Sequence, residues 1–252
     1  MSPSNAVRYG LHRCVYAAFH GVKLVSDIPE KQCRQGGRSF MSKKRQRRLD
    51  LIQKLGLAFV HVPKNAGTSI AYYLYGEPIG HSSIQYYRRV APDLFGSIPS
   101  FCILRDPIDR FLLAYRYATD NSSEKIALPF RGICSDFQHV GDAIDHLASA
   151  RDVFAVDKVF RSQALYVTNA RGELDVDQVV DYDELGQLGS IHPALVGADK
   201  VRLNASRREP ILLSPAQRLE VMRIYREDYD LIARSRRSNV VEFTGQLRRG
   251  AA

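Results

Sequence analysis

The sequence predicts an α/β protein in which a central, mainly parallel β-sheet is flanked by helices. Two short apolar runs, residues 57–62 and 100–105, have the length and composition of buried strands. Each run leads directly into a segment with the apolar spacing of a helix, and a third strand is expected around residues 178–182. Strands that alternate with helices favour parallel pairing, because each helix returns the chain to the same end of the sheet.

The helix after the first strand is expected over residues 69–75, where Gly76 provides the stop. The helix after the second strand has a clearer start, since Asp106 can cap it and Pro107 suits the first helical position. Four apolar residues then follow at positions i, i+3, i+4 and i+7 and should face the core: Ile108, Phe111, Leu112 and Tyr115.

Two further helices are predicted in the second half of the chain. The segment "SDFQHVGDAIDHLA" (residues 135–148) has apolar residues at helical spacing. A long amphipathic helix should begin after Ser214, because Ser214 and Gln217 form a capping box and Pro215 occupies the first helical position.

The expected organisation is one α/β domain with a short segment at each end. The domain covers residues 49–235, a basic and loosely ordered extension precedes it over residues 1–48, and a tail follows over residues 236–252. Met41 begins a segment that resembles a natural chain start, so a start at Met1 and a start at Met41 both remain open.

The net charge of +9 is concentrated near the N-terminus. Residues 1–50 hold 11 Lys and Arg against 3 Asp and Glu, a net charge of +8, whereas residues 51–252 hold 25 against 24. The run "KKRQRR" (residues 43–48) can contact phosphates or acidic lipids weakly, but such a run is more often a solvated flank. Because the body is nearly neutral, no specific nucleic-acid partner is expected, and a nucleic-acid-binding arm is the weaker alternative.

Membrane and metal signals are absent from the sequence pattern. No run approaches the roughly 18–20 apolar residues that a membrane-spanning helix needs, and the N-terminus lacks a clean signal-peptide core. The four cysteines show no metal-ligand spacing. The sequence therefore predicts a cytoplasmic protein with reduced thiols and without a metal.

The segment "HVPKNAGTSI" (residues 61–70) has the features of an anion-binding turn. In a parallel sheet, ligands bind at the carboxyl ends of the strands, where a turn exposes backbone N–H groups and the next helix adds its positive dipole end. Lys64 supplies a charge, Gly67 permits a close approach of the backbone or a positive φ, and Thr68 and Ser69 add hydroxyl donors. A plain strand–helix turn with a surface lysine is the alternative on this segment alone. It is not a Walker loop, in which the lysine follows the last glycine, because Lys64 precedes Gly67 by three residues.

Four segments, in order along the chain, carry a resemblance to a known family. They are "HVPKNAGTSI", "FCILRDPIDRFLLAYRYA", "VDYDEL" and "VRLNASRREPILLSPAQRLEVMRIYREDYDLI". The first resembles the 5′-phosphosulfate loop of carbohydrate sulfotransferases of the family 2 type, and the second resembles their other nucleotide motif. The resemblance covers residues 55–235. It implies a P-loop-like, three-layer α/β fold and transfer of a sulfuryl group from 3′-phosphoadenylyl sulfate (PAPS) to a hydroxyl of a carbohydrate or glycoconjugate.

The resemblance also assigns residues that bind PAPS: Lys64, Asn65, Ala66, Gly67, Thr68, Ser69, Arg105 and Ser206. In this assignment the loop holds the 5′-phosphate, and Arg105 binds the 3′-phosphate with its planar guanidinium. Lys64 is also catalytic, because its charge lies near the oxygen from which the sulfuryl group departs. A monoanionic sulfuryl group does not require a metal.

His81 is expected to be the catalytic base. It lies between the two nucleotide motifs, where the family carries a catalytic histidine, and an imidazole can take the proton from an acceptor hydroxyl. A loop histidine without a catalytic role is the alternative, and Glu77 is the second choice for the base. His61 is expected to pack within its strand.

One position departs from the pattern of the family. The serine that it carries eight residues after Arg105 is Leu113 here. A lost hydrogen bond to a charged group costs on the order of 1.5–3 kcal/mol, so PAPS would bind more weakly unless Ser206, Arg207 or Arg208 compensates. Leu113 therefore supports an alternative, a relative that binds the nucleotide without transferring sulfate or that uses an altered donor.

The sequence does not identify the acceptor. The segments 76–98 and 119–136 are expected to contact it, and "YYRR" (residues 86–89) could stack on or bind an acidic sugar. An ordinary amphipathic helix surface is the other interpretation of "YYRR".

Overall fold

Three parallel strands form the sheet in the part of the chain that the structure describes. The structure, a computed structural model, describes residues 17–37, 41–120, 126–200 and 210–249, with side chains described as far as residue 237. The strands are hydrogen-bonded in the order β1 (Ala58–Val60), β2 (Ser100–Leu104) and β3 (Gln178–Asp181). β1 and β2 are completely buried, as expected for continuous apolar runs. The α/β class and the parallel sheet predicted from the sequence are confirmed.

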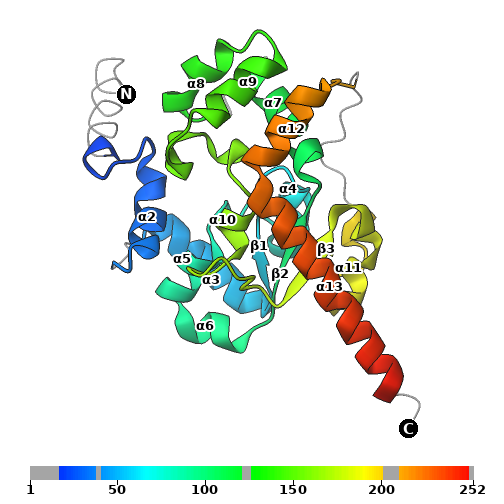
Figure 1. Cartoon of the computed structure of the whole chain (residues 1–252). Helices are drawn as coiled ribbons and strands as arrows, with labels where there is room; N and C mark the ends of the chain where they lie inside the picture. The colour runs from blue at the N-terminus through cyan, green and yellow to red at the C-terminus, as the bar shows by residue number, and fades with distance from the viewer. Residues whose placement is uncertain (1–16, 38–40, 121–125, 201–209, 250–252) are drawn as a thin grey trace.

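Helices make up most of the remaining described chain (Figure 1). The α-helices are α2 (Ile28–Arg34), α3 (Lys43–Leu55), α4 (Gly67–Tyr75), α5 (Ile84–Val90), α6 (Pro92–Ser97), α7 (Pro107–Thr119), α8 (Leu128–Ser135), α9 (Val140–Ala148), α10 (Ala164–Val167), α11 (Leu188–Ile191), α12 (Pro215–Ile224) and α13 (Arg226–Arg249). The 3₁₀ helices are η1 (Val25–Asp27), η3 (Val153–Ala155), η4 (Lys158–Phe160), η5 (Tyr182–Gln187), η6 (Pro193–Leu195) and η7 (Ala198–Lys200).

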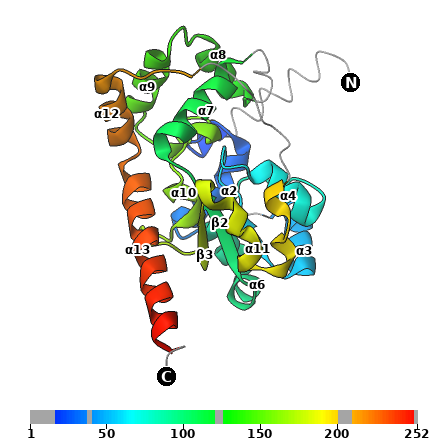
Figure 2. The same cartoon turned by 90° about the vertical axis from the view of Figure 1, so that its right-hand side faces the viewer.

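The sheet lies between helices. Figure 2 shows α10 and α13 on one side of the strands, and α3, α4 and α11 on the other. Helix α4 is attached to β1 through Tyr75, whose hydroxyl accepts from Phe59 N at 3.0 Å and donates to Leu57 O at 2.8 Å. The C-terminal end of α4 is therefore fixed to the start of β1 by buried hydrogen bonds.

Two large apolar cores and one small cluster around Ile28 and Phe154 stabilise the part of the chain that the structure describes. The first surrounds the sheet and contains Phe59 and Phe101, which stack at 4.9 Å between ring centroids. The second lies above it in Figure 1, where α7, α8, α9 and α12 pack around Phe111 and Phe130. Because α7 leaves β2 and enters the second core, the end of β2 lies where the two cores meet.

The helix boundaries predicted at Asp106, Gly76 and Ser214 are confirmed, whereas α4 begins at Gly67, two residues before the expected start. Asp106 caps α7, with Oδ1 accepting from Ile108 N at 2.9 Å and from Asp109 N at 3.0 Å. Gly76 ends α4 in the left-handed region, with φ of 70°. Ser214 and Gln217 form the expected capping box of α12.

The C-terminal helix differs from the prediction in two ways. It is interrupted at Tyr225, whose side chain is buried and donates from its hydroxyl to Phe160 O at 2.7 Å. It then continues as α13 to Arg249, beyond the expected end near residue 235. The break follows from anchoring Tyr225 in the second core, which the amphipathic pattern alone does not reveal.

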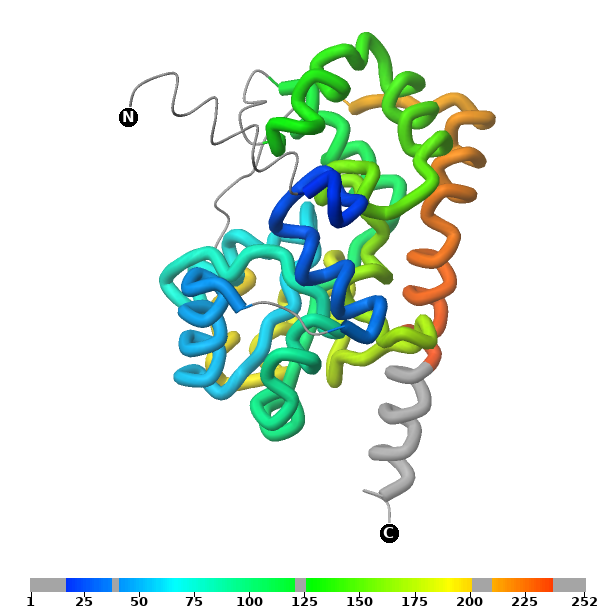
Figure 3. The backbone as a smooth tube through the Cα atoms, turned by 90° about the vertical axis from the view of Figure 1, so that its left-hand side faces the viewer, coloured from blue at the N-terminus to red at the C-terminus, as the bar shows by residue number. Residues whose placement is uncertain are grey.

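The expected loosely ordered extension over residues 1–48 needs correction where the structure describes it. Residues 17–37 include η1 and α2 and lie across the junction of the two cores (Figure 3). The basic run forms the start of α3, whose cap Ser42 accepts from Arg45 N at 3.3 Å. The charge pattern suggested a solvated arm, because the partners of these charges lie far away in the sequence.

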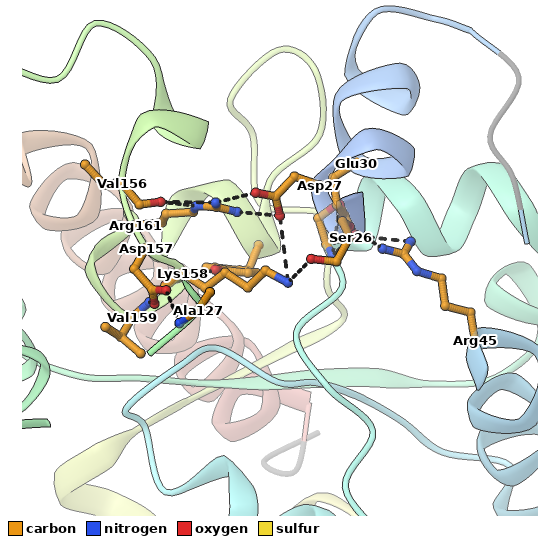
Figure 4. Close-up of polar contacts among 12 residues, drawn as sticks. Ser26, Asp27, Glu30, Arg45, Ala127, Val156, Asp157, Lys158, Val159 and Arg161 are labelled. Carbon is orange, nitrogen blue, oxygen red and sulfur yellow. Dashed lines mark hydrogen bonds and ion pairs between the residues drawn. The ribbon is translucent and has the colours of Figure 1, made fainter. Parts of the chain in front are cut away.

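A buried ion pair anchors this N-terminal segment to the body (Figure 4). Asp27 accepts from Arg161 through two hydrogen bonds of 3.0 and 2.6 Å, and Asp27 is 0% exposed. Lys158 donates to Ser26 Oγ at 2.7 Å, and its Nζ lies 3.7 Å from Asp27 Oδ1.

The described residues contain no helix that is long and apolar enough to cross a membrane.

Candidate functional site

The loop between β1 and α4 has an unusual backbone conformation. Lys64 and Ala66 have φ of 70° and 58°, in the left-handed region that side chains other than glycine rarely adopt. Ala66 is also the residue that precedes α4, and its methyl group cannot cap the helix. Strained backbone that persists at one place is typical of ligand-binding turns, and an uncapped helix start offers N–H groups to an anion.

Gly67 is required by the packing of His61. A Cβ at Gly67 would lie 1.9 Å from His61 Cδ2 and 2.2 Å from His61 Nε2. The close approach expected at Gly67 is therefore made by a side chain of the same protein. His61 packs against Phe59 at 5.6 Å between ring centroids, as predicted for a residue within the strand region.

Asn65 fastens the loop to the neighbouring strand. Its Nδ2 donates to Ile103 O at 2.7 Å and to Gln163 Oε1 at 2.6 Å, all in the interior. The side chain expected to contact a phosphate is thus used inside the protein, and an anion in the turn would meet the backbone of Asn65 instead.

Gln163 joins the loop after β1 to the end of β2, and sequence reasoning missed it. Its Oε1 accepts from Asn65 Nδ2 and, at 3.0 Å, from Arg105 N, while its Nε2 donates to Arg105 O at 2.8 Å. One fully buried amide therefore fixes the loop after β1 relative to the end of β2. The residue follows the short 3₁₀ helix η4, in a segment without any recognisable motif.

Each cation of the predicted site rests on a tyrosine ring. Lys64 Nζ lies 3.9 Å from the ring centroid of Tyr117 on α7, and the guanidinium of Arg105 lies 3.8 Å from that of Tyr182. Such contacts orient a cation without neutralising it. Tyr182 belongs to the "VDYDEL" segment, so three of the four segments that carry the resemblance meet here.

His81 is oriented by the chain just before the loop. Its Nδ1 lies 3.0 Å from His61 O, and because a carbonyl oxygen only accepts, Nδ1 carries the hydrogen and Nε2 carries the lone pair. The pKa of His81 is lowered to about 4, mainly by burial; the hydrogen bond to His61 raises it, and the charges of Lys158, Arg48 and Lys64 lower it. The imidazole is therefore neutral at physiological pH, which is the form that a base needs.

A small cavity lies beside His81. Its volume is about 10 Å³, the size of a single water molecule, so a sugar ring cannot enter it. It is lined by Asp27, Glu30, His81, Ser83, Phe154, Arg161, Leu165 and Tyr166. The N-terminal segment thus contributes two carboxylates to the surroundings of His81.

The remaining predicted residues have different positions. Thr68 is exposed and Ser69 is buried, both in the first turn of α4. Leu113 is half-buried on α7, one helical turn before Tyr117. Ser206 lies outside the described residues, together with Arg207 and Arg208.

Two other candidates have structural roles. Glu77, the second choice for the base, accepts from Arg47 at 2.8 and 2.6 Å. In "YYRR", Tyr86 and Tyr87 are 1% and 3% exposed, so they are not available to stack on a sugar. Arg88 donates to Phe95 O at 2.9 Å.

The arrangement can hold an anion and take up a proton at neighbouring points. Lys64 follows β1 and Arg105 follows β2, at the carboxyl ends of two adjacent parallel strands, and His81 is held by the backbone of His61 just after β1. The described residues contain no group of three or more His, Cys, Asp and Glu that could hold a metal ion.

Comparison with protein-family models, with curated proteins and with solved structures finds no match for this chain.

Proposed function

We propose that this protein is a sulfotransferase with a P-loop-like fold that moves a sulfuryl group from PAPS to a hydroxyl of a carbohydrate or glycoconjugate. The observation that carries the proposal is the hydrogen-bonded connection among three chemically distinct parts. Gln163 joins the anion-binding loop to Arg105, and His61 O orients His81.

The residues fit a donor with two phosphate positions. The left-handed backbone at Lys64 and Ala66 and the uncapped start of α4 suit the 5′-phosphate. Arg105, whose Nε is buried without a hydrogen-bond partner among the described residues, suits the 3′-phosphate. Leu113, one turn from Tyr117, places an apolar group where the family carries a serine.

The proposed reaction is an in-line displacement at sulfur. A bond forms between the acceptor oxygen and sulfur, and the bond between sulfur and the phosphate oxygen breaks. His81 Nε2 takes the proton of the acceptor hydroxyl, and Lys64 stabilises the negative charge on the departing phosphate oxygen. The products are a sulfate ester and adenosine 3′,5′-bisphosphate.

The alternative is a relative that binds the nucleotide but does not transfer sulfate, or that uses another donor. Leu113 favours it, because no hydroxyl is available at that point of α7. The two functions differ in one observable: both bind adenosine 3′,5′-bisphosphate, and only the sulfotransferase incorporates sulfate into a sugar.

The test compares wild type with Lys64→Ala in two measurements. Labelled sulfate transfer from PAPS to a panel of sugars should fall on the order of 100- to 1,000-fold, since fixed charge on the leaving oxygen is lost. Calorimetry with adenosine 3′,5′-bisphosphate should show a smaller loss. Lys54→Ala, at an exposed position of α3, is the matched control and should behave as wild type.

The outcomes separate the proposal from its alternative. Wild-type protein that binds the bisphosphate and sulfates no sugar supports the non-transferring relative. Wild-type protein that does neither, or a Lys64→Ala variant with undiminished turnover, contradicts the proposed function.

A further inference from the structure

We propose that residues 17–37 form a strap that covers His81 and opens to admit the acceptor. The inference rests on the proposed function for the role of His81 and deepens it by naming how access to that residue is controlled. It starts from the position of the strap, which contains η1 and α2 and lies across the junction of the two large cores (Figure 3).

The strap forms one wall of the small cavity beside His81. Asp27 and Glu30 line the cavity from the strap, whereas His81 and the other lining residues belong to the body of the protein. The volume of about 10 Å³ admits a single water molecule and no sugar. A sugar can therefore approach His81 through this cavity only when the strap moves away.

Charged side chains around η4 hold the middle of the strap. Arg161 donates two hydrogen bonds to Asp27, and Lys158 donates to Ser26 Oγ and lies 3.7 Å from Asp27 Oδ1 (Figure 4). Both cations come from a segment more than 130 residues away in the sequence. These contacts are concentrated at two consecutive residues of the strap.

A second group of contacts holds α2 to α3 and to the start of α5. Arg45 of α3 donates to Ser26 O at 2.7 Å and lies 3.7 Å from Glu30, and Ser83 Oγ donates to Glu30 Oε2 at 2.6 Å. Burial raises the pKa of Glu30, while Arg45 and Ser83 oppose that shift. The ionised carboxylate would therefore gain hydration when the strap opens, which favours opening.

The apolar attachment of the strap is small by comparison. One small cluster, separate from the two large cores, contains its buried apolar side chains: Ala17, Val22 and Ile28, packed with Phe154 of the body. Leu24 and Cys33 contact the large cores only as partly buried residues. A segment held by a few polar contacts and little apolar surface can separate while both large cores stay intact, as in local unfolding.

The experiment measures how fast diethyl pyrocarbonate labels His81 in the full-length chain at pH 7.5, with mass spectrometry of the labelled peptide. The reagent reacts with the lone pair of an unprotonated imidazole. Because the pKa of His81 is about 4, the ring is neutral at this pH, and the rate reports access. His139, whose side chain is 80% exposed, is the internal reference and should be labelled equally fast in every variant.

Two variants loosen the strap at different elements. Lys158→Ala removes a contact at η4 and Arg45→Ala removes contacts at α3, and each should speed the labelling of His81 at least fivefold. Hydrogen exchange in the same proteins should become faster at residues 17–37 and stay unchanged in β2, which separates local opening from general unfolding.

Two substitutions outside the strap are the matched controls. Arg47→Ala removes an arginine of α3 whose partner is Glu77, and Lys54→Ala removes an exposed lysine of the same helix. Both controls should label His81 at the rate of wild type.

Three outcomes would overturn the proposal. The first is a labelling rate of His81 that Lys158→Ala and Arg45→Ala leave unchanged. The second is hydrogen exchange that becomes faster in β2 as much as in the strap. The third concerns kcat/KM for the sugar, which should rise with the labelling rate and would overturn the proposal if it stayed level or fell. Labelling does not depend on sulfate transfer, so faster labelling without transfer in any protein, wild type included, contradicts only the proposed function.

Discussion

Two pairs of cations in this protein have similar chemistry and opposite surroundings. Arg110 and Arg161 are 0% and 3% exposed, and backbone carbonyls and a carboxylate take up their N–H groups. Lys64 and Arg105 are half-buried and rest on tyrosine rings. The first pair joins segments of the chain, and the second pair lies just after the carboxyl ends of β1 and β2.

The difference shows how one fold treats cations that hold the chain together and cations that are proposed to bind a ligand. A buried guanidinium needs a partner within the protein, because an unpaired charge in the interior costs several kcal/mol. A cation held over an aromatic ring is oriented by the quadrupole of the ring and keeps its charge. Substitutions at the candidate site should therefore lower activity more than stability. Substitutions at the anchor, the buried pair of Asp27 with Arg161, should lower stability more than activity.

The largest effect is expected at the site, from His81→Asn. Asn Nδ2 can still donate to His61 O, but the lone pair of Nε2 is lost, so kcat should fall about 100- to 10,000-fold. The unfolding midpoint and the affinity for adenosine 3′,5′-bisphosphate should stay near those of wild type.

The pH dependence provides a second measurement on the same residue. With a pKa of about 4, His81 stays unprotonated above that pH, so wild-type kcat should remain level from pH 7.5 to 5.5. An ordinary histidine, with a pKa of about 6.5, would lose about tenfold over this interval. Full activity of His81→Asn would move the base to another residue.

The next largest effect is expected at the anchor, from Asp27→Ala. Removing the carboxylate leaves Arg161 buried without its partner, which should lower the free energy of unfolding by about 3–5 kcal/mol. Denaturant titration measures this loss. Glu220→Ala, which breaks an exposed pair with Arg223, is the control and should leave the midpoint unchanged. An equally small change in Asp27→Ala would show that the N-terminal segment is not anchored by this pair.

The smallest effect is expected from Gly67→Ala, at a residue that packs against His61 and so touches both the interior and the candidate site. The new methyl group would meet the ring of His61, and overpacking of this kind lowers the free energy of unfolding by about 1–3 kcal/mol. Because His61 O orients His81, kcat should fall as well. Gly132→Ala, in α8 with nothing near its Cβ, is the control and should not destabilise the protein. A Gly67→Ala variant with wild-type stability and turnover would contradict the close packing of His61.

The elements of the fold were predictable where local chemistry decides them. The two strands, the cap at Asp106, the stop at Gly76 and the capping box at Ser214 all follow from residues within a few positions of each other. The position of the turn between β1 and α4 was predictable for the same reason, since strand, turn and helix are consecutive. The roles of Asn65 and Gln163 were not, because their hydrogen bond joins residues 98 positions apart.

The sequence by itself determined the class of the fold, the parallel strands and the place of a cationic turn at their carboxyl ends. Only the tertiary structure decided which arginine of "RDPIDR" is fully buried, since Arg105 and Arg110 differ in burial rather than in local pattern. It also decided that the basic N-terminal segment belongs to the body, through the pair of Asp27 with Arg161, 134 residues away. The physical reason is the same in both cases: a charge acquires its role from the partners that folding brings to it, and those partners are distant in the sequence.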